Sequence, residues 1–301
     1  AGVRPATGID PKNPKAKPMS RTTSMARRGY SRCAERWHPR LPVRSDSAIT
    51  HAVVDHARLR ALADHPLAWP YAAALGALPE QQAWSVHVLD ERLADRAGVR
   101  FVSSPPKARG ARRRRAAQPG YDETITSRRV VPTREGNLHD AMNALVWATF
   151  PESKLALHAR QAELVRGAQG GRSAEGDTVA MLDEGGILLC GRAGVTVEIE
   201  RAGRVRDEPA LCALVGAGQL VGVVFGHALL VQLAGGREPE VFGISLTVPL
   251  EELTRVDVDG ARAGIIRDRS HLTARDRYGS VRLAASVLGS GGELAGWEGR
   301  A

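Results

Sequence analysis

Residues 133–154 read TREGNLHDAMNALVWATFPESK. This stretch predicts two short helices joined at Phe150-Pro151, because Asn137 is a good N-cap residue and proline is tolerated in a first helical turn. The pair is largely apolar apart from a few side chains, which are those of His139, Asp140, Asn143 and Lys154. Polar groups placed where a core is expected indicate either a functional site or a buried hydrogen-bond network.

The first of these helices carries its polar residues on one side. On a helical wheel at about 100° per residue, a single arc holds His139, Asp140, Asn143 and Trp147. The helix has no charged face for solvent, so we expect it to be packed on most sides and the arc to face an interior cleft. On the second helix Lys154, His158 and Gln161 recur at helical spacing. The two polar stripes meet if the helices pack as an antiparallel or bent pair.

Both helices have the sequence of a capping box at their start. In the first helix Asn137 is the N-cap, and Asp140 is expected to reach back to its amide. In the second helix Thr149 and Glu152 form the box, and the helix is expected to end at Gly167.

The positive charge of the chain is concentrated in two segments. The full chain carries a formal charge of +9 at pH 7. Residues 1–50 and 100–134 each carry +8, so the rest of the chain carries −7. We therefore do not expect a basic face for specific nucleic-acid binding. Binding through the arginine tracts alone would be non-specific and salt-sensitive.

The cysteine content favours a reducing compartment. Cys33, Cys190 and Cys212 are too few and too scattered for a disulfide framework or a zinc knuckle. The N-terminal segment lacks the apolar core of a secretory signal. We therefore expect a cytoplasmic protein.

Residues 209–236 contain no Asp, Glu, Lys or Arg, and they include His227. This run exceeds the ~20 apolar residues that a membrane-spanning helix needs. Glycines and glutamines interrupt the run, which disfavours a lipid environment. We expect a buried helix with a short lead-in, and membrane association through 209–236 is the alternative.

The remaining pattern predicts an α+β fold, mainly helical with a small, mostly antiparallel sheet. Helices are expected over 45–64 and 79–97, with a short strand over 99–102. Further strands are expected over 178–182, 187–190, 195–199 and 242–248. A turn that contains Asp183 and Glu184 is expected to join the first two of these strands.

The chain divides into three expected parts. Residues 1–44 are rich in Pro, Arg, Ser and Thr and are expected to form a disordered basic tail. Residues 45–255 are expected to form a single globular domain, with a mobile Arg/Pro-rich loop at 103–120. Residues 256–301 are expected to be a partly packed C-terminal extension.

Four residues are suited to bind a divalent metal or to perform acid–base chemistry, namely His139, Asp140, Asp183 and His227. Each also has a structural interpretation. Acids such as Asp183 and Glu184 are ordinary turn formers. A lone buried histidine such as His227 is more often a satisfied core residue than a ligand. His139 and Asp140 lie in a first helical turn, where capping and the helix dipole each contribute ~1 kcal/mol or less.

Two further polar residues lie near this set. Asn143 can fix a neighbouring loop, which is a structural role. Burial of the Lys154 ammonium without a partner costs several kcal/mol. Asp140 or Asp183 is therefore expected to pair with it.

The order of these residues resembles that of a known family. Its motifs correspond here to Pro132–Gln161, to Asp183-Glu184, and to Phe225-Gly226-His227-Ala228-Leu229. Over about residues 50–255 the chain resembles a bacterial family catalogued as domain of unknown function 3025, which has no established activity. The resemblance favours a functional cleft and implies these shared polar positions: His139, Asp140, Asn143, Lys154, Asp183, Glu184 and His227. Where the family pattern carries an acid, this chain has Val231.

We therefore expect a soluble protein whose polar cleft performs hydrolytic chemistry on a small molecule with a divalent metal as cofactor. His139 and His227 are expected to act as ligand or general base. Asp140 and Asp183 are expected to act as ligand or orienter, and Lys154 to stabilise a developing anion. The alternative is a non-catalytic binding or scaffold protein in which the same side chains form a buried network.

Overall fold

The structure, a computed structural model, describes residues 56–79, 84–104, 120–167, 173–235, 241–249, 254–274 and 278–289. All of these residues belong to one compact unit that spans Ser47–Ala301. The expected basic tail at 1–44 lies outside the described residues, as do residues 105–119 of the expected loop and the start of the first expected helix.

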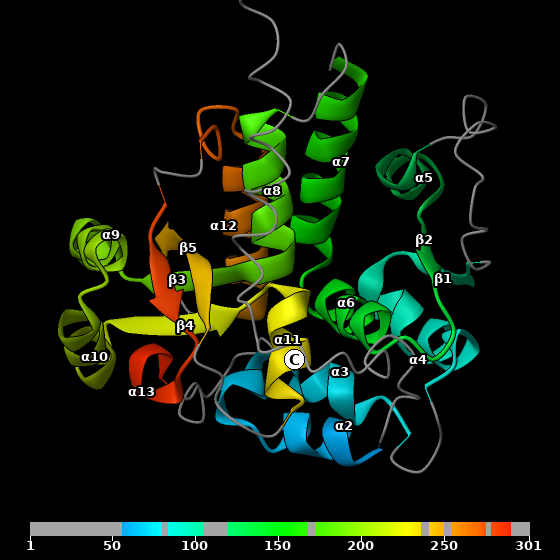
Figure 1. Cartoon of the computed structure of the whole chain (residues 1–301), viewed down its shortest axis with the longest axis horizontal. Coiled ribbons are helices and arrows are strands. Elements are labelled where there is room, and N and C mark those ends of the chain that lie inside the picture. Colours follow the sequence, from blue (N-terminus) through cyan, green and yellow to red (C-terminus); the bar gives the residue numbers. More distant parts are fainter. Residues whose placement is uncertain are drawn as a thin grey trace, which may run out of the picture. The chain divides into compact units, whose positions relative to one another are not determined.

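The fold is α+β and mainly helical, as predicted from the sequence (Figure 1). The larger sheet has the strand order β4-β3-β5-β6. Its strands are β3 (Gly186–Gly191), β4 (Leu220–Val224), β5 (Phe242–Pro249) and β6 (Ser280–Arg282). The pairs β3–β4 and β5–β6 are antiparallel and the pair β3–β5 is parallel. A smaller sheet pairs β1 (Arg100–Ser103) with β2 (Val130–Thr133) in parallel.

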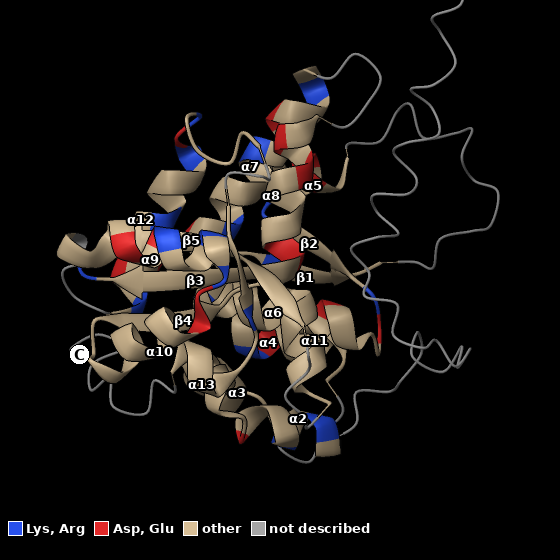
Figure 2. Cartoon of the chain, turned by 60° about the vertical axis from the view of Figure 1, so that its left-hand side comes forward, with Lys and Arg blue, Asp and Glu red and all other residues tan. Residues whose placement is uncertain are grey.

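The strands β3, β4 and β5 carry no charged residue, and their ribbons are tan in Figure 2. Every residue of β3 and β4 is buried, because helices pack against the sheet. Helices α8 (Ala174–Gly185), α9 (Thr196–Val205) and α12 (Arg255–Arg267) contact β5, and α10 (Glu208–Gly216) and α13 (Ala285–Leu288) contact β4. Figure 1 shows α9 and α10 to the left of the strands and α8 to their right.

The predicted central pair is present as α6 (Leu138–Thr149) and α7 (Pro151–Gly167). The side chain of Asn137 caps α6 by accepting a hydrogen bond from the amide of Asp140 at 3.1 Å. All residues of α6 from Ala141 onward are buried, which confirms that this helix has no solvated face. It packs against α4 (Val86–Ala97) and α11 (His227–Leu233).

The expected capping box of α7 is wrong. The hydroxyl of Thr149 donates instead to the main-chain oxygen of Leu145. The amides of Glu152 and Ser153 donate to the carboxylate of Asp259 at 2.9 and 2.8 Å. The first-turn donors of α7 are thus satisfied by a residue of α12, about a hundred positions away, which a local sequence pattern does not reveal.

Two predicted strands are helices. Residues 178–182 belong to α8, which Ser173 caps by accepting a hydrogen bond from the amide of Gly176 at 3.0 Å. Asp183 and Glu184 therefore lie in the last turn of a helix rather than in a hairpin turn. Residues 195–199 belong to the short 3-10 helix η4 (Ala193–Val195) and to α9. Short apolar runs fit the periodicity of a helix and that of a strand equally well. The strands that pair with β3 are β4 and β5, which come later in the chain.

The uncharged run at 209–236 is not one helix. It forms the body of α10, the strand β4 and the helix α11, separated at the glycines Gly216, Gly218 and Gly226. Among the helices of the described residues, none has both the length and the apolar character needed to cross a bilayer.

The other elements show where local signals were sufficient. The first expected helix ends as α2 (His56–Ala63), close to the predicted end. Helix α4 begins at Val86, later than predicted, because Ser85 caps it by accepting from the amide of Val88. The strand predicted over 99–102 is β1. The elements that the sequence left unassigned are η1 (Pro66–Tyr71), α3 (Ala72–Gly76), α5 (Tyr121–Arg128), β2, α12, β6 and α13.

Candidate metal centre

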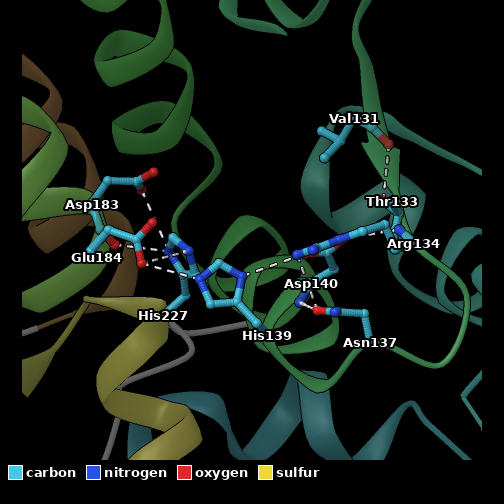
Figure 3. A network of polar contacts seen from close by, with 9 residues as sticks. All are labelled: Val131, Thr133, Arg134, Asn137, His139, Asp140, Asp183, Glu184 and His227. Atoms are coloured by element: carbon cyan, nitrogen blue, oxygen red, sulfur yellow. Dashed lines mark hydrogen bonds and ion pairs between the residues drawn. The ribbon is translucent and has the colours of Figure 1, made fainter. Parts of the chain in front are cut away.

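Three side chains from distant parts of the chain meet at one point (Figure 3). Nε2 of His139 lies 3.1 Å from Oε2 of Glu184, and Nε2 of His227 lies 3.4 Å from the same oxygen. The two imidazole rings are 4.4 Å apart between centroids, at an interplanar angle of 81°. One ligand atom of each residue lies within 4.8 Å of the other two. These three residues, which we call the metal group, can therefore hold one ion.

Three helix ends position the metal group. His139 is in the first turn of α6, Glu184 is in the last turn of α8, and His227 is the first residue of α11. Gly226 allows α11 to approach α8 this closely. A Cβ atom at Gly226 would overlap the main-chain oxygen of Glu184 and would lie 2.6 Å from Cα of Gly185.

The second nitrogen of each imidazole faces an oxygen acceptor. Nδ1 of His227 donates to the main-chain oxygen of Asp183 at 2.8 Å. Nδ1 of His139 lies 3.4 Å from Oδ1 of Asp140. When both imidazoles are neutral, protons on Nδ1 would leave the Nε2 lone pairs directed at the position between the rings and Glu184. A metal-ligating histidine usually has this arrangement.

The carboxylate of Asp140 is itself held in place by Arg134. It accepts hydrogen bonds from the main-chain amide of Arg134 at 2.8 Å, from Nε at 2.9 Å and from Nη2 at 2.7 Å. Burial raises the pKa of Asp140, but the bonds from Arg134 and His139 outweigh it and hold this pKa well below its ordinary value. The expected bond from Asp140 back to the amide of Asn137 does not form, because Arg134 takes both carboxylate oxygens.

The two histidines have opposite pKa shifts. Burial lowers the pKa of His139, but the hydrogen bonds to Asp140 and Glu184 prevail and raise it to about 9. Burial lowers the pKa of His227 to about 4, against the attraction of the Asp183 charge. The His227 imidazole is therefore neutral at neutral pH. The raised pKa keeps His139 protonated at neutral pH, so a metal ion would have to displace a proton from this imidazole.

Lys154 is fully buried and pairs with Asp183 rather than Asp140. Its Nζ lies 2.5 Å from Oδ1 of Asp183. Burial raises the pKa of the Asp183 carboxyl, but the charge of Lys154 prevails and places it well below its ordinary value. The ammonium of Lys154 is thus committed to Asp183, whose main-chain oxygen in turn binds His227.

The polar stripes of α6 and α7 meet next to this network. The ring of Trp147 stacks on the ring of His158 at 5.4 Å and 3°. Nδ1 of His158 lies 2.8 Å from a carboxylate oxygen of Asp122 on α5. Asn143 is buried on α6, one helical turn after His139, and its Oδ1 has no hydrogen-bond partner among the described residues. Asn143 therefore flanks the metal group instead of joining it.

Residues 109–255 match the model of a family described as "Protein of unknown function (DUF3025)". The match supports a domain of this family over that segment. The match is shorter than the resemblance over 50–255 that the motifs indicated. No curated protein and no solved structure matches the chain.

All residues of the metal group lie inside the DUF3025 segment, together with their partners Arg134, Asp140, Lys154 and Asp183. Of the predicted site residues, His139 and His227 contribute ligand atoms to the metal group. The carboxylate of Asp140 faces Nδ1 of His139, and the main-chain oxygen of Asp183 accepts a hydrogen bond from Nδ1 of His227. Lys154 contacts neither ring and binds the carboxylate of Asp183. Val231, where the resemblance led us to expect an acid, lies one turn after His227 on α11.

The residues predicted from the sequence to bind a metal do not include Glu184, whose carboxylate faces both imidazoles. The pair Asp183-Glu184 was interpreted as a turn, in which an acidic residue requires no partner. The available signal was the resemblance, which included Glu184 among the shared polar positions. Arg134 was missed as well, although it stands directly before the first central helix.

Proposed function

We propose that the protein binds a divalent metal ion through His139, Glu184 and His227 and uses it for hydrolysis. Two histidines and one glutamate form a common ligand set of catalytic zinc sites, in which a water molecule takes the fourth position. The observation that carries the proposal is the orientation of the rings. Both Nε2 atoms face one carboxylate oxygen while both Nδ1 atoms face oxygen acceptors.

In this proposal Asp140 and Asp183 orient the two imidazoles and do not bind the ion. Both carboxylates have a cationic partner, because Asp140 binds Arg134 and Asp183 binds Lys154. Glu184 is the acid whose carboxylate faces both imidazoles. The ligand set that we propose therefore contains Glu184 in place of the two aspartates expected from the sequence.

Solvent access supports a reactive site over a purely structural one. The side chain of Glu184 is 52% exposed and that of His139 is 39% exposed, whereas that of His227 is 4% exposed. Structural zinc sites are closed by four protein ligands, and catalytic ones keep an open position. Here His227 forms the buried base of the site and the other two residues border solvent.

The hydrolytic step that we propose needs little from the protein beyond orientation. A bound divalent ion lowers the pKa of a coordinated water to about 7 and polarises the oxygen of a substrate. The main-chain oxygen of Asp183 and the carboxylate of Asp140 fix the two rings and increase their basicity. Lys154 keeps Asp183 in place.

The test begins with Zn²⁺ and Mn²⁺ titrations of the metal-free protein by calorimetry, followed by the metal content of protein dialysed after loading. We expect one ion per chain. H139A, E184Q and H227A should each weaken binding by more than about a hundredfold, because loss of a supporting residue alone costs roughly 10–100-fold. The matched controls are H87A and E200Q, whose side chains are exposed on α4 and α9.

An open coordination position is tested separately. In protein loaded with Co²⁺, azide should change the visible spectrum by displacing the coordinated water. A spectrum that does not respond to azide would contradict a catalytic ion even if the metal binds tightly.

The rival function is a non-catalytic protein in which these side chains form a structural network. It is favoured if H139A and H227A lower the melting temperature of the metal-free protein strongly and no variant changes metal binding. The partial exposure of Glu184 and His139 argues against it, since a structural network gains most from burial.

A further inference from the structure

We propose that Arg134 binds a carboxylate group of the substrate beside the metal group. This inference rests on the proposed metal function and names the chemical class of the substrate. Metal binding and carboxylate recognition are measured separately below, so that either one can fail alone.

The guanidinium of Arg134 is fixed but only partly used. Nε and Nη2 donate to Asp140, and Nη2 also lies 3.3 Å from Oδ1 of Asn137. No hydrogen bond among the described residues involves Nη1 of Arg134. The side chain is 53% exposed. An arginine held in one orientation by its own protein, with free N–H groups facing solvent, is pre-organised to bind an anion.

Arg134, His139 and Glu184 are partly exposed members of one network. Figure 3 shows Glu184 and Arg134 on opposite sides of His139. The link between them consists of the His139 ring and two contacts, 3.4 Å from that ring to Asp140 and 2.7 Å from Asp140 to Arg134. In our proposal a small molecule bound at the ion extends past the His139 ring and reaches Arg134 with a second functional group.

The charge of the network favours an anion once the ion is bound. Two cations, Arg134 and Lys154, lie in the network. Three carboxylates lie there as well, those of Asp140, Asp183 and Glu184. A divalent cation therefore leaves one surplus positive charge, which a single carboxylate neutralises. The planar guanidinium also matches the two oxygens of a carboxylate.

The experiment compares two ligands of equal chain length on the Zn²⁺-loaded, full-length protein. Glutarate carries a carboxylate at both ends and pentanoate carries one, so both can reach the ion but only glutarate can also reach Arg134. Succinate and adipate test neighbouring lengths. We expect the wild-type protein to bind the best dicarboxylate at least tenfold more tightly than its monocarboxylate counterpart.

Substitutions assign that preference to Arg134. R134Q keeps a donor for Asp140 but removes the charge, and it should abolish the preference. R134K should retain part of it. R204Q is the matched control, because Arg204 is an exposed arginine of α9 with an acidic partner, and it should bind both ligands as the wild type does. The Zn²⁺ affinity of each variant is measured first.

Each outcome has one meaning. A wild-type protein that binds no Zn²⁺ overturns the metal function and this inference with it. A protein that binds Zn²⁺ but has no preference for a dicarboxylate overturns the inference alone. A preference that persists in R134Q also overturns it. If R134Q lowers only the Zn²⁺ affinity, Arg134 merely positions Asp140.

Discussion

Arg134, Asp140 and His139 form a series in which each side chain fixes the next. Arg134 provides three N–H donors to Asp140, and the carboxylate of Asp140 faces Nδ1 of His139. The neutral form of this imidazole then favours one tautomer, with the proton on Nδ1 and the lone pair on Nε2. Asp140 thus controls a ligand of the metal group without contributing a ligand atom itself.

Replacing Asp140 by asparagine should lower the Zn²⁺ affinity by roughly 10–100-fold, because the imidazole of His139 loses its anionic acceptor. The matched control is D90N. Asp90 is as buried as Asp140, with side-chain exposures of 15% and 16%, and it also accepts from an arginine side chain and a main-chain amide. Calorimetry at one pH measures the affinities, and melting temperatures in EDTA should fall similarly for both. Equal Zn²⁺ affinity of D140N and the wild type would contradict this role.

For single residues of the site, the sequence indicates the residue types but not their interaction partners. His139 and His227 were identifiable because an imidazole in an apolar segment needs a hydrogen-bond partner. Glu184 was not, because an acid before two glycines fits a turn equally well. Its distinguishing property is a contact with His139, 45 positions away, and no local pattern contains that contact.

Helix ends are the elements that build the site. The first turns of α6 and α11 and the last turn of α8 converge, and each contributes one residue of the metal group. The sequence predicted α6 correctly because Asn137 and the apolar period agree. It misassigned α8, because Thr178 to Leu182 is a short apolar run whose flanking signals resemble those of a strand. The position of Glu184 could not be predicted without α8.

Gly226→Ala should separate α11 from α8. The added methyl group would overlap the main-chain oxygen of Glu184, so the backbone has to move and His227 moves with it. We expect Zn²⁺ affinity to fall at least tenfold and the protein to be less stable. Gly264→Ala is the control, since a Cβ at Gly264 has no neighbour within 4 Å and alanine favours a helix by up to about 1 kcal/mol. Normal Zn²⁺ binding by G226A would show that the close approach is not required.

Helix α12 stabilises the start of α7 through Asp259. Asp259→Ala removes the acceptor of two first-turn amides, those of Glu152 and Ser153. We expect a loss of about 2 kcal/mol in the free energy of unfolding, measured by urea denaturation. Asp257→Ala on the same helix should cost less, because Asp257 interacts locally with Thr254 at an exposed helix start. Equal losses for the two variants would argue against the capping role of Asp259.

The family-matched segment and the compact unit have different limits. The match covers residues 109–255, whereas the compact unit spans Ser47–Ala301. Contacts cross both boundaries of the segment. On one side the hydroxyl of Tyr71 donates to the main-chain oxygen of Val224 at 2.7 Å and α4 packs on α6. On the other side α12 packs on α7 and β6 pairs with β5. Most of these contacts are between residues far apart in sequence, so local sequence patterns do not reveal how the C-terminal part packs.

A fragment of residues 109–255 should therefore not fold cooperatively, because it lacks β6, α4 and nearly all of α12. A fragment of residues 47–301 should fold and bind Zn²⁺ with the affinity of the full chain. Circular dichroism during heating and calorimetric titration measure the two properties. A sharp melting transition of the 109–255 fragment would show that the family segment is a complete domain.

The convergence of three helix ends on one ion would couple the amount of protein in the cell to its metal supply. An ion that binds only the folded chain holds α6, α8 and α11 together and increases stability by about 1.4 kcal/mol for each tenfold excess over its Kd. Under metal starvation the same chain would open more often and be degraded sooner. The steady-state amount of the protein would then follow the supply of the ion.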